Sequence, residues 1–537
     1  MKHAFFSWRN SVLLALLGAI SALSFAPGPL PAPILPFVQI AALACLAGYV
    51  LNAPTPGQSA WAGFLFGFGQ FALGLYWIFI SLHRYGGLPS PLAAGAVLVL
   101  AAGGGLYFAL AGALARWLGN PSSPSRYRQL LDAAVWASCW AGAEWLRGTL
   151  FTGFPWLGTG YAHADGPLSG WAAVVGVYGL AWIAAYVAAA LTLLVRTRAK
   201  TGKIALATAV VLALAGIGLK QISWSAPFGP PLQVRLVQGN IPQSEKFDPQ
   251  LMQKGIETYM RLAAQPFKET GAESRLIVMP ETIMPMFQDE YSPQVWSLWK
   301  AIAREQHATL LMGVPLHTRE DGRNRYTNSA IALNADTPVE QLLTGTMPMR
   351  YDKHHLVPFG EFIPTGFHWF VNAMHIPLGD FNRGAARQRL FNLDGQILAP
   401  NICYEDIFGE EIIRAVGDSP AHGPGATLLV NISNLAWFGD SWALRQHLQI
   451  SRLRAMETAR PIIRATNTGA TAVIDSGGLV QALLPVNTTG VLDTVVQGTR
   501  GLTPYVRWGN APVLAWLALI LLMGLGRRYY SRKRTRH

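Results

Sequence analysis

The chain has 537 residues, of which 51% are hydrophobic and 13% charged, well below the ~25% charged share typical of soluble proteins. This composition, with 54 glycines and 18 tryptophans, indicates a membrane protein of several domains. The net charge of +13 comes largely from Lys and Arg beside apolar segments, so we expect no nucleic-acid partner. Two of the three cysteines fall inside apolar segments, which argues against a disulfide framework.

Eight apolar segments predict membrane-spanning helices. Each approaches or exceeds the ~20 residues that cross a bilayer, except the first, which is marginal. The first segment resembles a signal peptide, but further spans follow at once and no clear cleavage site ends it, so we expect it to be retained. The segments are 11–25, 31–51, 60–81, 91–115, 131–149, 167–195, 203–223 and 510–526.

The fifth segment contains Glu144 and Arg147, which are spaced to pair on one helix face. The pair fits a polar groove for a lipid head group and an internal ion pair near the membrane edge equally well. The sequence leaves both interpretations open.

Clusters of Lys and Arg set the expected topology. They follow the fourth, sixth and eighth segments, and eight spans with a cytoplasmic N-terminus place all of them in the cytoplasm. Dropping one early span would put them on the side of the membrane opposite to the N-terminus. We therefore expect a multi-pass protein of the bacterial inner membrane with both termini cytoplasmic. Its parts would be a membrane domain (1–224), a periplasmic catalytic domain (225–505), and an eighth helix with a basic tail (506–537).

Residues 225–505 alternate strands with helices and hairpins, which predicts an α/β layered domain. We expect helices at 249–264, 292–306, 409–416 and 441–459. Strands are expected at 232–237, 275–278, 309–314, 326–333, 340–346, 390–393, 396–402, 426–432, 462–466 and 471–475.

Three polar residues stand out by position. Glu281 and Cys403 each follow an apolar strand, at the edge where α/β sites assemble, and Lys353 lies in a distinctive polar string. Read singly, such a cysteine is more often a core residue, and such a glutamate or lysine a surface residue. Read together, they suit acyl transfer. The carboxylate takes the thiol proton, and the ammonium favours the thiolate and the oxyanion.

His354 and His355 invite a metal interpretation. Adjacent residues cannot easily face one ion, and neither a HExxH pattern nor a Cys/His spacing for zinc is present. We expect neither a metal nor another cofactor.

The strings 279–282, 351–361 and 401–405 resemble the Glu–Lys–Cys signatures of the nitrilase superfamily. Together with the spans and the strings 237–243, 432–440 and 454–461, they make nearly the whole chain similar to the integral-membrane apolipoprotein N-acyltransferases. The resemblance implies a nitrilase-like αββα sandwich beside about eight spans. It also implies that Glu281 is the general base, Lys353 the oxyanion stabiliser and Cys403 the nucleophile.

The resemblance extends to residues around these three. Glu361 would be a second carboxylate that aids proton transfer or holds Lys353, and Tyr404 and Glu405 would shape the acyl pocket or lid. Phe247 stands where a family tryptophan is expected, which keeps an aromatic ring but loses the indole N–H. Further polar positions expected to support the site are Asn328, Asn434 and Glu457.

The family implies a two-step exchange, and we expect the protein to act as a monomer. Cys403 takes an acyl chain from a phospholipid, with phosphatidylethanolamine expected, and the α-amine of a diacylglyceryl-cysteine on an apolipoprotein then attacks the thioester. The alternative is a membrane-tethered nitrilase-like amidase or hydrolase, although a tether needs only one span. A non-catalytic transporter or scaffold is a third reading, which the intact Glu281, Lys353 and Cys403 oppose. Aromatic residues near Lys353 form either a lid at the membrane interface or ordinary core packing: Phe359, Phe362, Phe367, Trp369 and Phe370.

Overall fold

The computed structural model describes residues 7–25, 30–119, 126–197, 200–268, 274–363 and 380–534. It divides into two compact units. The helical unit comprises Met1–Phe79, Ser90–Ser223 and Arg507–His537. The α/β unit comprises Ile80–Pro89 and Trp224–Val506.

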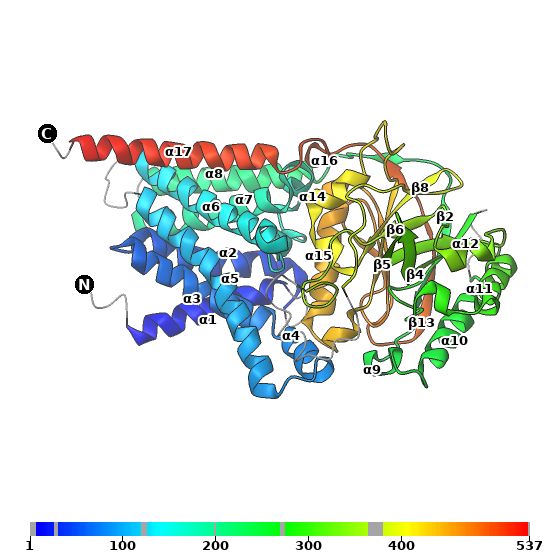
Figure 1. Cartoon of the computed structure of the whole chain (residues 1–537). Coiled ribbons are helices and arrows are strands. Elements are labelled where there is room, and N and C mark those ends of the chain that lie inside the picture. Colours follow the sequence, from blue (N-terminus) through cyan, green and yellow to red (C-terminus); the bar gives the residue numbers. More distant parts are fainter. Residues whose placement is uncertain are drawn as a thin grey trace. The chain divides into compact units, whose positions relative to one another are not determined.

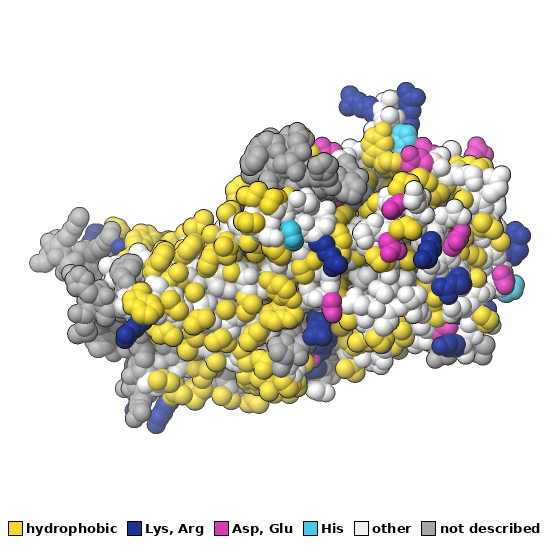
Figure 2. Space-filling model, turned by 90° about the horizontal axis from the view of Figure 1, so that it is seen from below, with side chains coloured by type: hydrophobic (Ala, Val, Ile, Leu, Met, Phe, Trp, Pro, Cys, Tyr) yellow, Lys and Arg dark blue, Asp and Glu magenta, His cyan; other side chains and the backbone are white. Residues whose placement is uncertain are grey.

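All eight segments predicted as spans are helical, and Figure 1 shows the long helices of this unit running side by side. Figure 2 shows hydrophobic side chains over most of the visible face of this unit, as expected for a surface that meets lipid. The helices are α1 (Trp8–Ala22), α2 (Leu35–Asn52), α3 (Pro56–Gly74), α4 (Trp77–Ile80), α5 (Ser90–Leu118), α6 (Arg126–Thr149), α7 (Ala172–Thr197), α8 (Lys200–Leu219) and α17 (Ala511–Arg534).

The number of helices suited to crossing a membrane is lower than the predicted eight. Among the described residues, six helices are long and apolar enough by length and composition. A seventh is added if α3 and the following Trp77–Tyr85, bent by 50°, form one span. Helix α6 falls short because charged side chains, Asp132, Glu144 and Arg147 among them, lower its hydropathy.

Glu144 and Arg147 are both buried and both bind the loop that follows α6. The Glu144 carboxylate accepts hydrogen bonds from the backbone N–H (3.0 Å) and the hydroxyl (2.6 Å) of Thr159. The Arg147 guanidinium donates to the carbonyl oxygens of Phe154 and Trp156. The two side chains therefore fix the aromatic loop within the helical unit.

The α/β unit contains two six-stranded sheets with a central parallel portion in each. The first sheet has the order β13 (Gly490–Val496), β2 (Leu232–Gln238), β3 (Ser274–Val278), β4 (Ala308–Glu320), β5 (Arg323–Leu333) and β6 (Arg350–Asp352). The second has the order β12 (Val480–Leu483), β11 (Ala472–Ile474), β10 (Ile462–Thr466), β9 (Leu428–Ser433), β8 (Gln396–Ile402) and β7 (Phe391–Leu393).

Alternation along the strands explains how the sheets stack. Leu276 and Val278 point to a core shared with Val430 of the other sheet. Ile277, between them, points outward into a second core beneath α10 (Met252–Ala263) and α11 (Pro293–Gln306). On the far side, α14 (Gly409–Ile412) and α15 (Trp442–Thr458) cover the second sheet (Figure 1). The result is the four-layered αββα sandwich that the resemblance implied.

The predicted strand at 340–346 is wrong, because residues Val339–Thr344 form helix α12. Pro338 precedes its first turn, which carries Glu340, and Gly345 ends it in the left-handed conformation (φ 71°). These are standard signals for the start and end of a helix. The short strand β6 and the partly exposed strand β13 were not predicted.

Residues Ile80–Pro89 belong to the α/β unit although the helices around them in the sequence do not. They include a π-helical turn, Ser81–Tyr85. The Tyr85 ring packs edge-on against Trp437, with 5.8 Å between ring centroids. This contact joins the segment to the loop after β9.

Candidate active site

Cys403 lies where β8 ends and a short 3₁₀ helix, Cys403–Ile407, begins. Its backbone is in the left-handed region (φ 53°), which costs a non-glycine residue about 1–3 kcal/mol unless the surroundings hold it. Two contacts do so on either side of Cys403. The Glu405 carboxylate accepts the backbone N–H of Ile402 at 2.7 Å, and His447 Nε2 lies 3.1 Å from the carbonyl oxygen of Cys403.

The donor role of His447 follows from its second nitrogen. Arg464 is a pure donor and lies 3.0 Å from His447 Nδ1, so that nitrogen accepts and Nε2 carries the proton. Burial and the nearby Arg464 charge lower the pKa of His447 well below its usual range. A neutral histidine therefore donates to the backbone of Cys403 from α15.

Glu281 follows β3 and is buried. The chain can turn here because Gly313 of β4 lies against it: a Cβ on Gly313 would come within 2.6 Å of Glu281 Cα. Glu281 Oε1 accepts from Lys353 Nζ (3.2 Å) and Asn328 Nδ2 (2.8 Å). Its other oxygen accepts the backbone N–H of Asn434 at 2.9 Å. Residues on β5 and directly after β6 and β9 thus orient this carboxylate.

Lys353 follows β6 and is 1% exposed. Its ammonium donates to Glu281 and, at 2.8 Å, to Glu361 Oε1. Asn328 Nδ2 also donates to Glu361 Oε1 at 2.6 Å, so the amide bridges both carboxylates. Among the described residues, these contacts use two of the three N–H groups of Lys353.

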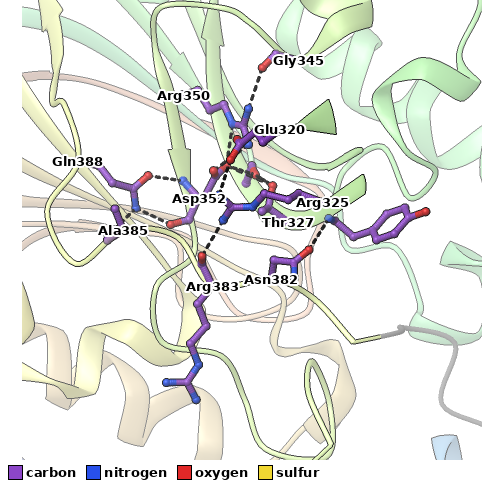
Figure 3. A network of polar contacts seen from close by, with 12 residues as sticks. Glu320, Arg325, Thr327, Gly345, Arg350, Asp352, Asn382, Arg383, Ala385 and Gln388 are labelled. Carbon is purple, nitrogen blue, oxygen red and sulfur yellow. Dashed lines mark hydrogen bonds and ion pairs between the residues drawn. The ribbon is translucent and has the colours of Figure 1, made fainter. Parts of the chain in front are cut away.

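The strand before Lys353 is fixed by a polar network around Asp352, shown in Figure 3. Arg350 makes a two-pronged contact with the Asp352 carboxylate, with both nitrogens at 2.8 Å. The side chain of Gln388 pairs with the Asp352 backbone, accepting its N–H at 2.8 Å and donating to its carbonyl at 2.6 Å. Because Lys353 comes next in the chain, this network sets where its side chain starts.

Electrostatics favour a neutral thiol beside charged partners in the resting site. Burial and the charges of Glu281 and Glu361 raise the pKa of Cys403, against the opposing effect of Lys353. Burial raises the pKa of Glu281, but the charge of Lys353 and the hydrogen bond from Asn328 outweigh it, and the net pKa is lowered. Lys353 keeps its proton because its two carboxylates outweigh burial and raise its pKa. The arrangement is a base, a thiol and a fixed cation.

Glu405 connects the two chain segments that carry Cys403 and Lys353. Besides Ile402, its carboxylate accepts the backbone N–H groups of His354 (2.7 Å) and His355 (3.0 Å) and the hydroxyl of Tyr351 (2.9 Å). It is buried, and all four partners are donors, which an ionised carboxylate satisfies. Its predicted part in an acyl pocket or lid stays a prediction.

The remaining predicted residues fall into different surroundings. Tyr404 packs edge-on against Phe408, and Phe247 lies 6.4 Å from Trp437 between ring centroids. Glu457 forms a fully buried ion pair with Arg454 at 2.5 Å. Of the five expected lid aromatics, Phe359 and Phe362 are described, and the other three lie outside the described residues: Phe367, Trp369 and Phe370.

One buried cation in this region was missed by sequence reasoning. Lys246, on the short helix α9 (Gln243–Lys246), donates from Nζ to the carbonyl oxygen of Glu281 at 3.0 Å. In the sequence, Lys246 follows the polar residues Gln243, Ser244 and Glu245, a pattern typical of an exposed segment. Two signals pointed to it only weakly: the neighbouring aromatic Phe247, and the nearby string 237–243 that carries part of the family resemblance.

The adjacent histidines are used structurally. His354 Nδ1 contacts the carbonyl oxygen of Gly384 at 2.8 Å, and the ring of His355 stacks on Phe408 at 3.6 Å between centroids. Within the described ranges, no group of three or more His, Cys, Asp and Glu residues is arranged to hold a metal ion.

Comparison with known proteins now defines the class. Residues 233–505 match the carbon-nitrogen hydrolase family model, so the α/β unit is a carbon-nitrogen hydrolase domain. Residues 17–190 match the model described as the apolipoprotein N-acyltransferase N-terminal domain. The chain is 53% identical to an apolipoprotein N-acyltransferase of Bordetella bronchiseptica over 534 residues, covering 97% of each chain. The chain belongs to the apolipoprotein N-acyltransferase family.

Two further similarities were found. An apolipoprotein N-acyltransferase of Ralstonia nicotianae is 47% identical over 519 residues, covering 96% of this chain and 93% of the relative. A crystal structure of a CN-hydrolase superfamily protein from Xanthomonas campestris covers 54% of this chain and 97% of its own, with 20% identity and a TM-score of 0.36. The family membership makes this protein an acyltransferase.

Proposed function

We propose that this protein transfers an acyl chain from a phospholipid to the α-amine of the N-terminal diacylglyceryl-cysteine of apolipoproteins. This would be the last step of bacterial lipoprotein maturation. One observation carries the proposal: the buried Glu281 and Lys353 lie within electrostatic reach of the partly exposed Cys403, in a chain that belongs to the apolipoprotein N-acyltransferase family over its full length.

In the first half-reaction, Glu281 takes the proton of the Cys403 thiol as Sγ attacks the ester carbonyl of the phospholipid. The remaining N–H of Lys353 stabilises the oxyanion. As the C–O bond breaks, the protonated Glu281 returns the proton to the departing glycerol oxygen. The products are a lysophospholipid and a Cys403 thioester.

In the second half-reaction, the α-amine of the diacylated apolipoprotein attacks the thioester. Glu281 takes a proton from the amine and passes it to the sulfur of Cys403 as the C–S bond breaks, so that the amide forms and the thiol is restored. Phosphatidylethanolamine is the donor we propose, and the protein acts as a monomer. Glu361 and Asn328 hold Lys353 and Glu281 in place through both steps, which is what their contacts support.

The protein would lie in the bacterial inner membrane with the catalytic domain in the periplasm and both termini in the cytoplasm. The basic clusters after three of the predicted spans support this topology. The apolar helices supply the membrane attachment that two lipid substrates require.

The test incubates the purified full-length protein with acyl-labelled phospholipid and follows the peptide containing Cys403 by mass spectrometry. We expect a thioester-linked acyl group, and its transfer to a diacylated lipopeptide added afterwards. Cys403→Ala should abolish both, and Cys403→Ser should leave at most a trace. Normal transfer by Cys403→Ala would refute the mechanism, while release of free fatty acid without transfer would favour a hydrolase.

A further inference from the structure

Lys246 is a buried cation next to the proposed base that the mechanism above does not use. Its side chain is 4% exposed, and its Nζ donates to the carbonyl oxygen of Glu281. An ammonium has three N–H groups. In the part of the chain that the structure describes, that carbonyl is its hydrogen-bond acceptor, so two N–H groups remain for the space around the site.

Helix α9 holds this ammonium in a fixed position. At its other end, Gln243 accepts a hydrogen bond from Asn434 Nδ2 at 2.8 Å. The backbone N–H of the same Asn434 binds the Glu281 carboxylate. The helix is therefore attached to the site at both ends, through Gln243 and through Lys246. Lys246 is thus presented to Glu281 from a short, anchored turn.

Lys246 brings a second positive charge to the cluster formed by Glu281, Glu361 and Lys353. Glu281 and Glu361 bring two negative charges, and Lys353 brings one positive charge. Moving a proton from Cys403 to Glu281 shifts one negative charge to sulfur, and attack on a carbonyl then shifts it to oxygen. Without Lys246, the cluster of Glu281, Glu361 and Lys353 carries one net negative charge in each of these states, and a cation close to Glu281 lowers the cost of holding that charge away from water.

We propose that Lys246 is a second functional ammonium of this site, whose positive charge supports formation of the Cys403 thioester. Both Glu281 and Cys403 lie within electrostatic reach of its Nζ. The inference rests on the proposed roles of these two residues. It assigns to Lys246 a second positive charge for the developing anion, in addition to the N–H that Lys353 offers while it stays paired with Glu281 and Glu361.

Burial lowers the pKa of Lys246 to about 8, against the charges of Glu281 and Cys403, which raise it. The ammonium is thus present below about pH 8 and is lost as the pH rises through that value. A neutral amine still donates to the Glu281 carbonyl. The hydrogen bond and the packing of Lys246 therefore persist at high pH, and only its charge disappears.

This difference separates an electrostatic role from a structural one. Single-turnover formation of the Cys403 thioester is measured for wild-type and Lys246→Met proteins, full-length in detergent micelles with phospholipid and no acceptor amine. At about pH 6.5 we expect the variant to be slower by about tenfold or more, and at about pH 9.5 by less than about threefold. Titration of the lipid affects both proteins equally, so it cancels in the ratio of the wild-type rate to the Lys246→Met rate at each pH.

Two further variants complete the test. Lys254→Met changes an exposed lysine on α10 and should match the wild type at every pH. Lys246→Arg keeps the charge, so its rate should not fall as the pH rises through about 8. If Lys246→Met does not fold, judged by thermal unfolding, the alkaline limb of Lys246→Arg against that of the wild type decides the question.

A ratio of rates that is the same at both pH values, or an unchanged alkaline limb in Lys246→Arg, would overturn the inference. Cys403→Ala is assayed for transfer in parallel. Transfer by that variant would refute the proposed thioester mechanism, whereas its inactivity together with a pH-independent ratio of rates would refute only the role of Lys246.

Discussion

Replacing Glu405 by glutamine tests the bridge between the turn that carries Cys403 and the segment that carries Lys353. One carboxylate oxygen accepts three hydrogen bonds, from Tyr351 and from two backbone N–H groups, and the other accepts the N–H of Ile402. A glutamine oxygen can keep the three bonds, without the charge. Its NH₂ group then faces the N–H of Ile402, and two donors meet.

The cost can be worked out from these contacts. Losing one hydrogen bond to a charged group removes ~1.5–3 kcal/mol, and leaving a buried donor unpaired costs ~1–3 kcal/mol. A net loss of about 3 kcal/mol in the geometry that brings Cys403 and Lys353 together corresponds to a roughly 100-fold slower step. Because Glu405 is buried, we expect the loss in the rate of thioester formation rather than in the affinity for phospholipid.

The assay measures single-turnover thioester formation over a range of phospholipid concentrations, with thermal unfolding as a check of the fold. Glu340→Gln, an exposed glutamate on α12, is the matched control and should behave as the wild type. A folded Glu405→Gln protein that forms the thioester within about threefold of the wild-type rate would refute the reasoning.

Two other predictions follow from the hydrogen bonds around the site. Asn328→Leu removes the donor shared by Glu281 and Glu361. Because this hydrogen bond helps to lower the pKa of Glu281, the variant should have a higher Glu281 pKa. As the pH is lowered, thioester formation should therefore fall at a higher pH than in the wild type. A pH profile of thioester formation checks this, and an acid limb that stays in place would contradict it. His447→Leu removes the donor to the carbonyl oxygen of Cys403 and should slow thioester formation by roughly tenfold, for a loss of ~1–3 kcal/mol. An unchanged rate in a folded variant would show that the conformation of the Cys403 turn does not depend on the hydrogen bond from His447.

The sequence predicts those site residues that directly follow a strand. Glu281 and Cys403 each end an apolar strand, and the edge of an α/β sheet is where side chains from distant strings meet. Lys353 was found through its string and its family resemblance, because a lysine after a three-residue strand has no periodic signal of its own. The bridging contacts of Asn328 and Asn434 depend on tertiary packing, which no spacing reveals.

The burial of Lys246 was missed, and residues 340–346 were wrongly assigned to a strand, for different reasons. Lys246 lies among polar residues in the sequence, and its burial arises only because α9 folds back onto the turn after β3. At 340–346 the local signals were present, since Pro338 and Gly345 bound a short helix, but a run of Leu and Thr was read as a strand. Helix α6 shows another limit of the sequence: Glu144 and Arg147 were expected to pair with each other or to form a head-group groove, and they bind the loop that follows the helix.

The segment Ile80–Pro89 has a practical consequence for protein engineering. A truncated enzyme that starts at Trp224 would lack these ten residues, and Trp437 would lose the Tyr85 ring that covers it. Trp437 also neighbours Phe247, the residue after Lys246, so the loss reaches the chain next to the site. A single cut before Trp224 therefore removes part of the α/β unit together with the helices. A soluble version would need Ile80–Pro89 supplied again, for example as a peptide added in trans or fused ahead of β2.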